Sequence, residues 1–298
     1  MKKKWYRPVL YICARSIQPL LLFLPRVIVL GIAKLLGWSA FYFLKRERER
    51  TLSHIRYAFG SSKDEQWCTQ IVRRVFVNMA LTAADFARFP RMRMKHIEAL
   101  VTTVGMEKVE DIMQRQERGL IVITAHLGNW ELIAATFMNH GYTGCVLGTE
   151  IYYSLYNQII IDLRESQKVY TFYRDRSPKD ILRRLKSGEV VGILPDQDIA
   201  DVEGIFLDFF GKPAYTPTGP VKLALAADVP IILAFMVRAG DRYRLLFDDI
   251  IEPVLFEGED KTKAVERMTR RWHTIVERYI KAYPDQWVWM HNRWKTKK

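Results

Sequence analysis

The stretch from residue 119 to 139, GLIVITAHLGNWELIAATFMN, constrains the fold of this chain more than any other part. Residues 120–125 form an apolar run rich in β-branched side chains, which is typical of a strand buried on both faces. From Asn129 onward, apolar side chains recur at helical spacing, so we expect a helix there with Asn129 as its N-cap. The pattern predicts a strand that leads directly into a helix, through a turn that Gly128 permits.

Two residues that can carry chemistry, His126 and Glu131, lie at this junction. On a regular helix, side chains five residues apart point about 140° away from each other, so these two meet only if the chain turns between them. His126 is then expected at the carboxyl end of a parallel strand, where open α/β sheets bind ligands. A carboxylate bonded to one ring nitrogen leaves the other free as a base. The pattern favours a catalytic pair; the alternative is a structural histidine with Glu131 as a helix N-terminal charge.

Most other apolar patterns alternate between strands and helices. Strands are expected at residues 169–173, 189–194, 230–237 and 243–247. Helices are expected at residues 62–86, 105–118, 150–168, 178–187, 220–227 and 261–282. Such alternation predicts an α/β fold with a largely parallel central sheet. With 298 residues, 49% of them hydrophobic, the chain is long enough for one such domain, which we place at residues 46–298, after helical segments and an N-terminal appendage.

Residues 1–45 form that appendage, an apolar segment with basic residues at both ends. Arg15, Arg26 and Lys34 interrupt it, and its longest charge-free runs are ten residues, short of the roughly 20 that span a bilayer. This favours a segment that lies in the membrane interface over a single membrane span. The alternative is a buried amphipathic hairpin. No small-residue cleavage site ends the apolar run, which argues against a signal peptide.

The net charge of +13 suits a polyanionic partner, such as an anionic membrane, a phosphorylated lipid, an acidic protein or nucleic acid. The alternative is a solvated basic surface without a dedicated partner. No nucleic-acid-binding module is recognisable, so we expect no nucleic-acid partner. The three cysteines are widely spaced, which predicts free thiols in a reduced compartment.

Polar groups follow three of the expected strands. They are His126 with Glu131, Arg174 with Arg176, and Asp196 with Asp198. If the strands are parallel, these groups converge on one edge of the sheet. The arginines would stabilise an oxyanion or hold a phosphate, unless they form a solvated basic loop. No further ligand cluster accompanies the aspartates, which disfavours a metal site. The chain also lacks the Gly-x-Ser-x-Gly pattern of serine nucleophiles and the glycine-rich loops of nucleotide sites.

Four ordered blocks resemble the bacterial lipid A biosynthesis acyltransferases, the late lauroyl and myristoyl transferases with an HX4(D/E) motif. The blocks are HLGNWE at residues 126–131, PDQD at 195–198, FFGKPAYTPTG at 209–219 and QWVWMHNRWK at 286–295. The resemblance covers most of the chain after about residue 45 and implies a glycerolipid acyltransferase-like fold. The motif is shared with acyltransferases of other glycolipids. An enzyme of that class therefore remains an alternative.

The resemblance implies transfer of a fatty acyl chain from acyl carrier protein, or from acyl-CoA, to a hydroxyl of a lipid A precursor. The enzyme would need no cofactor or metal and would work at the cytoplasmic side of the bacterial inner membrane. Its partners would be acyl carrier protein, an anionic glycolipid and the membrane. His126 would deprotonate the hydroxyl, and Glu131 would orient His126.

Further site residues are expected from the same resemblance. Substrate or oxyanion contacts would come from Arg164, Arg174, Arg176, Asp196, Asp198 and Thr218. The acyl groove would be bordered by Trp130, Phe206, Phe209 and Phe210. From the sequence alone, the phenylalanine cluster is more typical of a core. Two rival functions remain: an acyltransferase of another glycolipid or a lysophospholipid, and a basic membrane-attached binding protein without catalysis.

Overall fold

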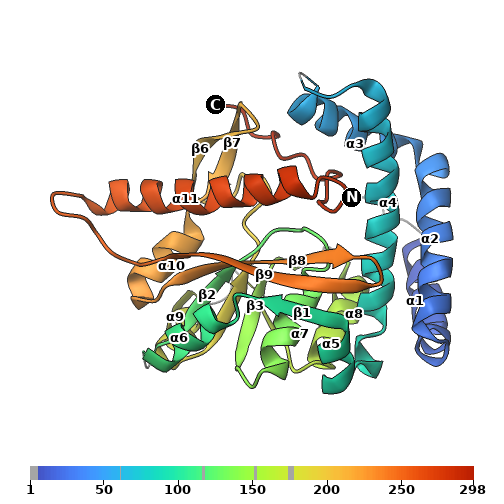
Figure 1. The fold of residues 1–298 in the computed structure, drawn as a ribbon, viewed down its shortest axis with the longest axis horizontal. Helices are drawn as coiled ribbons and strands as arrows, with labels where there is room; N and C mark the ends of the chain where they lie inside the picture. The colour runs from blue at the N-terminus through green and yellow to red at the C-terminus, as the bar shows by residue number, and fades with distance from the viewer. Residues whose placement is uncertain (1–5, 61, 116–117, 151–152, 174–177) are drawn as a thin grey trace.

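The computed structural model describes residues 6–60, 62–115, 118–150, 153–173 and 178–298. The strands in these residues are β1 (Val101–Val104), β2 (Leu120–Ile123), β3 (Gly144–Gly148), β4 (Tyr170–Tyr173), β5 (Val190–Ile193), β6 (Gly204–Phe209), β7 (Lys212–Pro217), β8 (Ile231–Ala239) and β9 (Arg242–Ile251). They form a seven-stranded sheet in the order β1-β9-β8-β2-β5-β3-β4 and a separate β6–β7 hairpin (Figure 1). Neighbours in the large sheet are parallel, except for β8 and β9. The predicted largely parallel sheet is confirmed.

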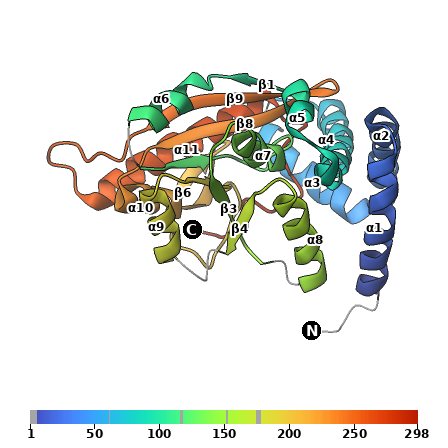
Figure 2. The same cartoon turned by 90° about the horizontal axis from the view of Figure 1, so that it is seen from below.

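Helices cover both faces of the sheet (Figures 1 and 2). The helices in the described residues are α1 (Tyr6–Phe23), α2 (Arg26–Phe43), α3 (Lys45–Phe59), α4 (Glu65–Ala87), α5 (Met94–Leu100), α6 (Glu107–Arg115), α7 (Glu131–Asn139), α8 (Ser154–Glu165), α9 (Pro178–Lys186), α10 (Gly219–Ala227) and α11 (Lys261–Ala282), with a 3-10 turn at Phe89–Arg91. Four strands, β1, β3, β6 and β7, were not expected from the sequence. β1 (VTTV) is half polar, and β3 (GCVLG) begins and ends with glycine, so neither is a continuous apolar run.

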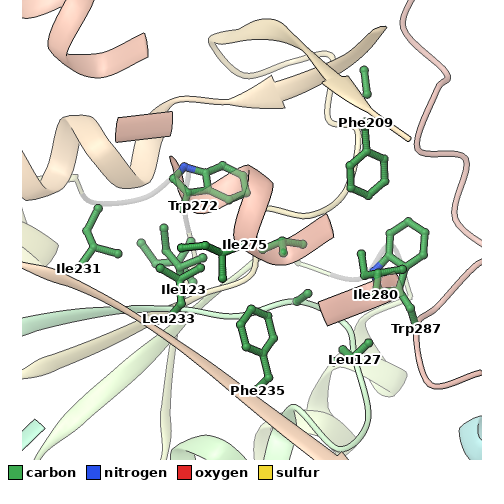
Figure 3. Close-up of a cluster of buried hydrophobic side chains, with 14 of the residues drawn as sticks. Ile123, Leu127, Phe209, Ile231, Leu233, Phe235, Trp272, Ile275, Ile280 and Trp287 are labelled. Carbon is green, nitrogen blue, oxygen red and sulfur yellow. The ribbon is translucent and has the colours of Figure 1, made fainter. Parts of the chain in front are cut away.

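Strand β2 shows why the central sheet is buried on both faces. Its residues alternate between two hydrophobic clusters: Ile121 and Ile123 face α9, α10 and α11, whereas Leu120 and Val122 face α5, α6 and α7. All four side chains are buried, as a strand between two helical layers requires. Figure 3 shows the first cluster, where Ile123 and Leu233 lie beneath Trp272 and Ile275 of α11.

The N-terminal helices α1 and α2 form a hairpin that packs against α4 at one side of the molecule (Figure 1). Gly37 allows α2 to approach closely, because a Cβ there would lie 2.7 Å from the Cα of Val77. At the start of α2, Arg26 binds the buried carboxylate of Asp85 on α4 through two nitrogens, at 2.8 and 2.9 Å. On α1, Arg15 pairs with Asp162 of α8 at 3.0 Å. The hairpin is therefore tied to the body along its length.

Candidate active site

The segment between β2 and α7 makes the turn that the sequence predicts at Gly128. Gly128 has φ +62°, and a Cβ at this position would lie 1.9 Å from the carbonyl oxygen of Met236. Its N–H donates to Gln286 O (2.9 Å), and its carbonyl accepts from Thr82 Oγ1 (2.9 Å). Any other residue at position 128 would collide with β8 and adopt a strained backbone, so this glycine is required.

Asn129 is not the N-cap of α7 that the pattern predicts. The helix begins at Glu131, and Trp130 occupies the N-cap position. Asn129 is instead fully buried, and its Nδ2 donates to Tyr243 Oη at 3.2 Å. The Tyr243 hydroxyl in turn donates to Asp85 at 2.6 Å, in a polar network beneath the loop. A polar side chain buried at the turn therefore serves to hold the loop, which local spacing alone does not reveal.

His126 lies at the end of β2 and faces Asp196, which follows the adjacent strand β5. Its Nδ1 lies 2.8 Å from Asp196 Oδ1, and its backbone N–H donates to Asp196 Oδ2 at 2.9 Å. The indole N–H of Trp287 also donates to Oδ2, at 2.8 Å. Three donors thus hold the carboxylate of Asp196 in its ionised form, with its side chain almost fully buried. The prediction that the loops after β2 and β5 converge is confirmed.

Burial alone would lower the pKa of His126, but the charge and hydrogen bond of Asp196 outweigh it and raise the pKa above its ordinary value. Burial alone would raise the pKa of Asp196, and the same partnership lowers it instead. Because an ionised carboxylate only accepts hydrogen bonds, Nδ1 of His126 carries a proton and Nε2 keeps its lone pair. The arrangement prepares His126 to act as a base through Nε2.

The prediction that Glu131 contacts the ring of His126 is wrong, because Asp196 occupies Nδ1 and Glu131 binds another residue. Both carboxylate oxygens of Glu131 bind Arg164 of α8, through Nε at 2.8 Å and Nη2 at 2.7 Å. Trp130 Nε1 also donates to Glu131, at 3.2 Å. Glu131 is the first residue of α7, and the guanidinium of Arg164, not the imidazole, binds its carboxylate. Glu131 therefore fixes Arg164, whose Nη1 also donates to Thr171 Oγ1 at 3.1 Å.

A pocket of about 540 Å³ opens in front of His126. Its polar lining includes His126, Glu131, Arg164 and Thr218. Its apolar lining is supplied by Trp130, Leu147, Ile160, Ile161, Ile193, Leu194, Ile199, Val202 and Leu223. This volume lies within the range of small-molecule sites, and a largely apolar wall with a few convergent polar groups is their usual composition. The pocket suits a chain-like apolar substrate whose polar end reaches His126.

The remaining predicted polar residues do not all reach this pocket. Thr218 lines it, at the N-cap of α10, with its hydroxyl bonded to the Glu203 carbonyl at 3.2 Å. Asp198 points to the C-terminal segment, where it accepts from the N–H and hydroxyl of Thr296, at 2.8 and 2.7 Å. Neither Asp198 nor Asp196, whose carboxylate is held by His126 and Trp287, lines the pocket, so the structure does not support either as a substrate contact. Arg174 and Arg176 lie outside the described residues, and their role stays a prediction.

Of the predicted acyl-groove residues, Trp130 lies in the pocket, with its ring centroid 5.1 Å from that of His126. Phe209 and Phe210 belong instead to the core, where both are buried among the aromatic residues of the C-terminal segment. Phe206 packs on Tyr215 across the β6–β7 hairpin and does not line the pocket. None of the three phenylalanines lines the pocket, whose wall is formed largely by aliphatic side chains of α8, β3 and the loop after β5.

The four sequence blocks meet in space. The C-terminal block crosses the first one: Val288 N–H donates to His126 O at 3.1 Å, and Trp287 holds Asp196 of the second block. In the third block, the hydroxyl of Thr216 accepts from Arg293 of the fourth, at 2.7 Å. The sequence signal for the role of Asp196 was its place directly after a buried strand. The support from Trp287 had no local signal, because the two residues are 91 positions apart.

Comparison with known proteins identifies the family of this chain. The family model described as bacterial lipid A biosynthesis acyltransferase matches residues 7–296. The lipid A biosynthesis lauroyltransferase of Escherichia coli is 28% identical over 291 residues, which cover 92% of this chain and 87% of the relative. A phosphatidylinositol mannoside acyltransferase of Mycobacterium tuberculosis is 27% identical over 118 residues, 38% of this chain and 37% of the relative.

Among solved structures, the 1-acyl-sn-glycerophosphate acyltransferase of Thermotoga maritima matches with a TM-score of 0.40 and 14% identity, over 87% of this chain and 99% of that one. The match of the family model over nearly the whole chain shows the family. The chain belongs to the bacterial lipid A biosynthesis acyltransferases and is an O-acyltransferase of that pathway.

Proposed function

We propose that this enzyme transfers an acyl chain from the thioester of acyl carrier protein to a hydroxyl of a lipid A precursor, with His126 as general base. The observation that carries the proposal is the imidazole of His126, which Asp196 holds at Nδ1 at the mouth of a largely apolar pocket. A base whose pKa lies near the working pH combines the correct protonation state with useful proton affinity. Asp196 raises the pKa of His126, which increases the proton affinity of the unprotonated ring.

The chemical step uses the groups of the pocket in order. Nε2 of His126 takes the proton of the acceptor hydroxyl, whose oxygen attacks the thioester carbonyl and forms a C–O bond. The tetrahedral oxyanion then collapses, the C–S bond breaks, and the proton on Nε2 passes to the departing thiolate. General-base assistance of this kind typically contributes about 10²–10⁴-fold. Asp196 stabilises the imidazolium that forms between the two proton transfers, because its carboxylate is already ionised.

Arg164 is the described residue best placed to meet negative charge in the pocket. Glu131 and Thr171 occupy three of its five N–H groups, which leaves two for a substrate. These would contact either the oxyanion or a phosphate of the acceptor. In this proposal Glu131 is a positioning residue that acts through Arg164. The bidentate pair with Glu131 would hold the guanidinium in one position at the pocket.

The N-terminal hairpin supports attachment to a membrane. Apolar side chains of α1 and α2 that face away from the body are exposed: Ile12, Ile17, Leu20, Phe23, Val27, Leu35, Leu36 and Phe43. α2 is the one described helix long and apolar enough to cross a bilayer. However, α2 contacts α4 at both ends, through Arg26 and Phe41, so it lies along the body. This favours interfacial insertion of the exposed face over a separate span. The cytoplasmic side of the inner membrane stays a prediction.

An assay with purified full-length enzyme tests the proposal. The donors are the same acyl chain on acyl carrier protein and on coenzyme A, and the acceptors are a lipid A precursor and a lysophospholipid. We expect transfer from acyl carrier protein to the lipid A precursor, seen as the mass of the acylated product. His126→Ala should abolish it, whereas His140→Ala should not, because His140 is exposed at the far end of α7. Preferred transfer to the lysophospholipid would refute the acceptor, and full activity of His126→Ala would refute the base.

A further inference from the structure

A second pocket, of about 280 Å³, lies at the turn of the N-terminal hairpin and shares no lining residue with the catalytic pocket. Its walls come from the start of α2, the 3-10 turn, α5 and the β8–β9 turn. The basic residues among its lining are Arg26, Arg88, Arg91, His96 and Arg242. Asp241 is the one acidic residue among those that line it in the described part of the chain.

The positive charge of this arginine pocket is only partly balanced, because Asp85 pairs with Arg26 and Asp241 lines the pocket, whereas Arg91 and Arg242 form no ion pair with an acidic side chain in the described residues. Asp85 lies behind it, but its two oxygens already bind Arg26 and the hydroxyl of Tyr243. Arg88 is 7% exposed, and no ion pair with an acidic side chain is found for it in the described ranges. Burial, and then the neighbouring Arg91, lower the pKa of Arg88. Four arginines against two nearby carboxylates leave an excess of positive charge at the pocket, which favours an anion there.

Part of this cluster has a structural role that must be separated from binding. Arg88 donates to the carbonyls of Leu21 and Leu24, and Arg91 donates to that of Leu22, so both cap the C-terminal end of α1. Arg242 has no such structural role, because no hydrogen bond or ion pair of its side chain is found among the described residues. It is exposed and lines the pocket. A substitution at Arg242 therefore tests ligand binding without removing the groups that cap α1.

The place of the pocket indicates the source of the anion. Phe23 and Val27, at the turn of the hairpin, are 79% and 76% exposed, among the most exposed apolar side chains described. We propose that the arginine pocket binds the phosphate of an anionic lipid headgroup while these apolar side chains enter the same membrane. The proposal rests on the membrane attachment proposed above. Guanidinium groups match phosphate geometry, and basic residues near a membrane surface are attracted to anionic lipids.

Titration of the full-length enzyme in neutral detergent tests this site. The probes are dihexanoyl phosphatidylglycerol, dihexanoyl phosphatidylcholine and inorganic phosphate, and calorimetry measures binding. Arg242→Glu removes the free cation, and Arg244→Glu is the matched control, because Arg244 is exposed two residues further along β9 and does not line the pocket. We expect phosphatidylglycerol to bind the wild type and Arg244→Glu alike, and Arg242→Glu at least tenfold more weakly.

Three outcomes would overturn the proposal. Equal binding of the two lipids by the wild type would indicate detergent-like insertion only. Equal loss of binding in both variants would indicate a general charge effect. Inorganic phosphate that binds as tightly as phosphatidylglycerol would assign the site to a free ion. Acyl transfer by Arg242→Glu to a micellar acceptor should equal that of the wild type, so failure of this site is distinguishable from failure of the catalytic proposal.

Discussion

Replacement of Asp196 by asparagine should disable the enzyme by changing the tautomer of His126. In the wild type, Asp196 Oδ2 accepts from two fixed donors, the backbone N–H of His126 and the indole N–H of Trp287. The single oxygen of an asparagine must take this place, because the amide NH₂ has no acceptor there. The NH₂ then faces Nδ1 of His126, which has to become an acceptor. The proton moves to Nε2, and the lone pair that the substrate hydroxyl requires is lost.

The expected size of this effect follows from the geometry. A catalytic histidine held in the wrong tautomer typically loses about 10⁴-fold in kcat, which corresponds to about 5 kcal/mol of transition-state stabilisation. The raised pKa of His126 should also fall, since the charge of Asp196 is gone. KM should change little, because Asp196 lies behind His126 and does not line the pocket. The assay is steady-state transfer from acyl carrier protein to the lipid A precursor, with kcat and KM determined separately.

Asp198→Asn is the matched control for Asp196→Asn. Asp198 accepts from the N–H and the hydroxyl of Thr296, and an asparagine can accept from the first and donate to the second. No hydrogen bond joins Asp198 to His126 in the described residues, so the kcat of Asp198→Asn should stay near that of the wild type. A folded Asp196→Asn enzyme within tenfold of the wild-type kcat would refute the tautomer argument. An equal loss in Asp198→Asn would show that both variants act through the fold.

Four further outcomes follow from the structure. The protonated imidazole of His126 cannot accept a proton, so kcat/KM of the wild type should fall as pH drops through a midpoint above the ordinary 6.5; a midpoint at or below 6.5 contradicts this. Arg164→Lys keeps the charge but loses the planar fork bound to the carboxylate, and should lower kcat by about 10²-fold; wild-type kcat would exclude a specific contact. Ile161→Trp fills part of the apolar wall and should disfavour long-chain donors by at least about tenfold in competition between acyl carrier proteins; an unchanged preference places the chain elsewhere. Leu36→Glu, on the exposed face of α2, should release the enzyme from vesicles in a flotation assay, whereas Val254→Glu, on the exposed segment between β9 and α11, should not; equal release would argue against the hairpin as the anchor.

The sequence predicts the central layer of the fold well because its strands are buried on both faces. β2, β5 and β8 are continuous apolar runs, and the long helix α11 has the same bounds as expected. β1 escapes prediction because half of its residues are threonine, and β3 because its apolar residues stand between two glycines. The β6–β7 hairpin depends on Phe210, whose φ of +57° at the turn is a conformation that its residue type does not suggest.

The site was predictable in its location but not in its pairings. A buried strand followed by a polar loop places His126 and Asp196 on one edge, since the carboxyl ends of parallel strands coincide. Which carboxylate meets which cation depends on strand order. β2 lies beside β5, so Asp196 reaches the imidazole, while α8 brings Arg164 to Glu131. Local spacing contains no information on this order, and the short distance between His126 and Glu131 in the sequence favoured the wrong pair.

The protonation of the two ring nitrogens of His126 tests the central claim most directly. ¹⁵N chemical shifts of the histidines in full-length enzyme distinguish an N–H from an unprotonated nitrogen, and the spectrum of His126→Gln identifies the signals among the six histidines. Above the raised pKa of His126, we expect Nδ1 to carry the proton and Nε2 to be unprotonated. Asp196→Asn should reverse the two signals. A wild-type spectrum with the proton on Nε2 would contradict the assignment of His126 as the base.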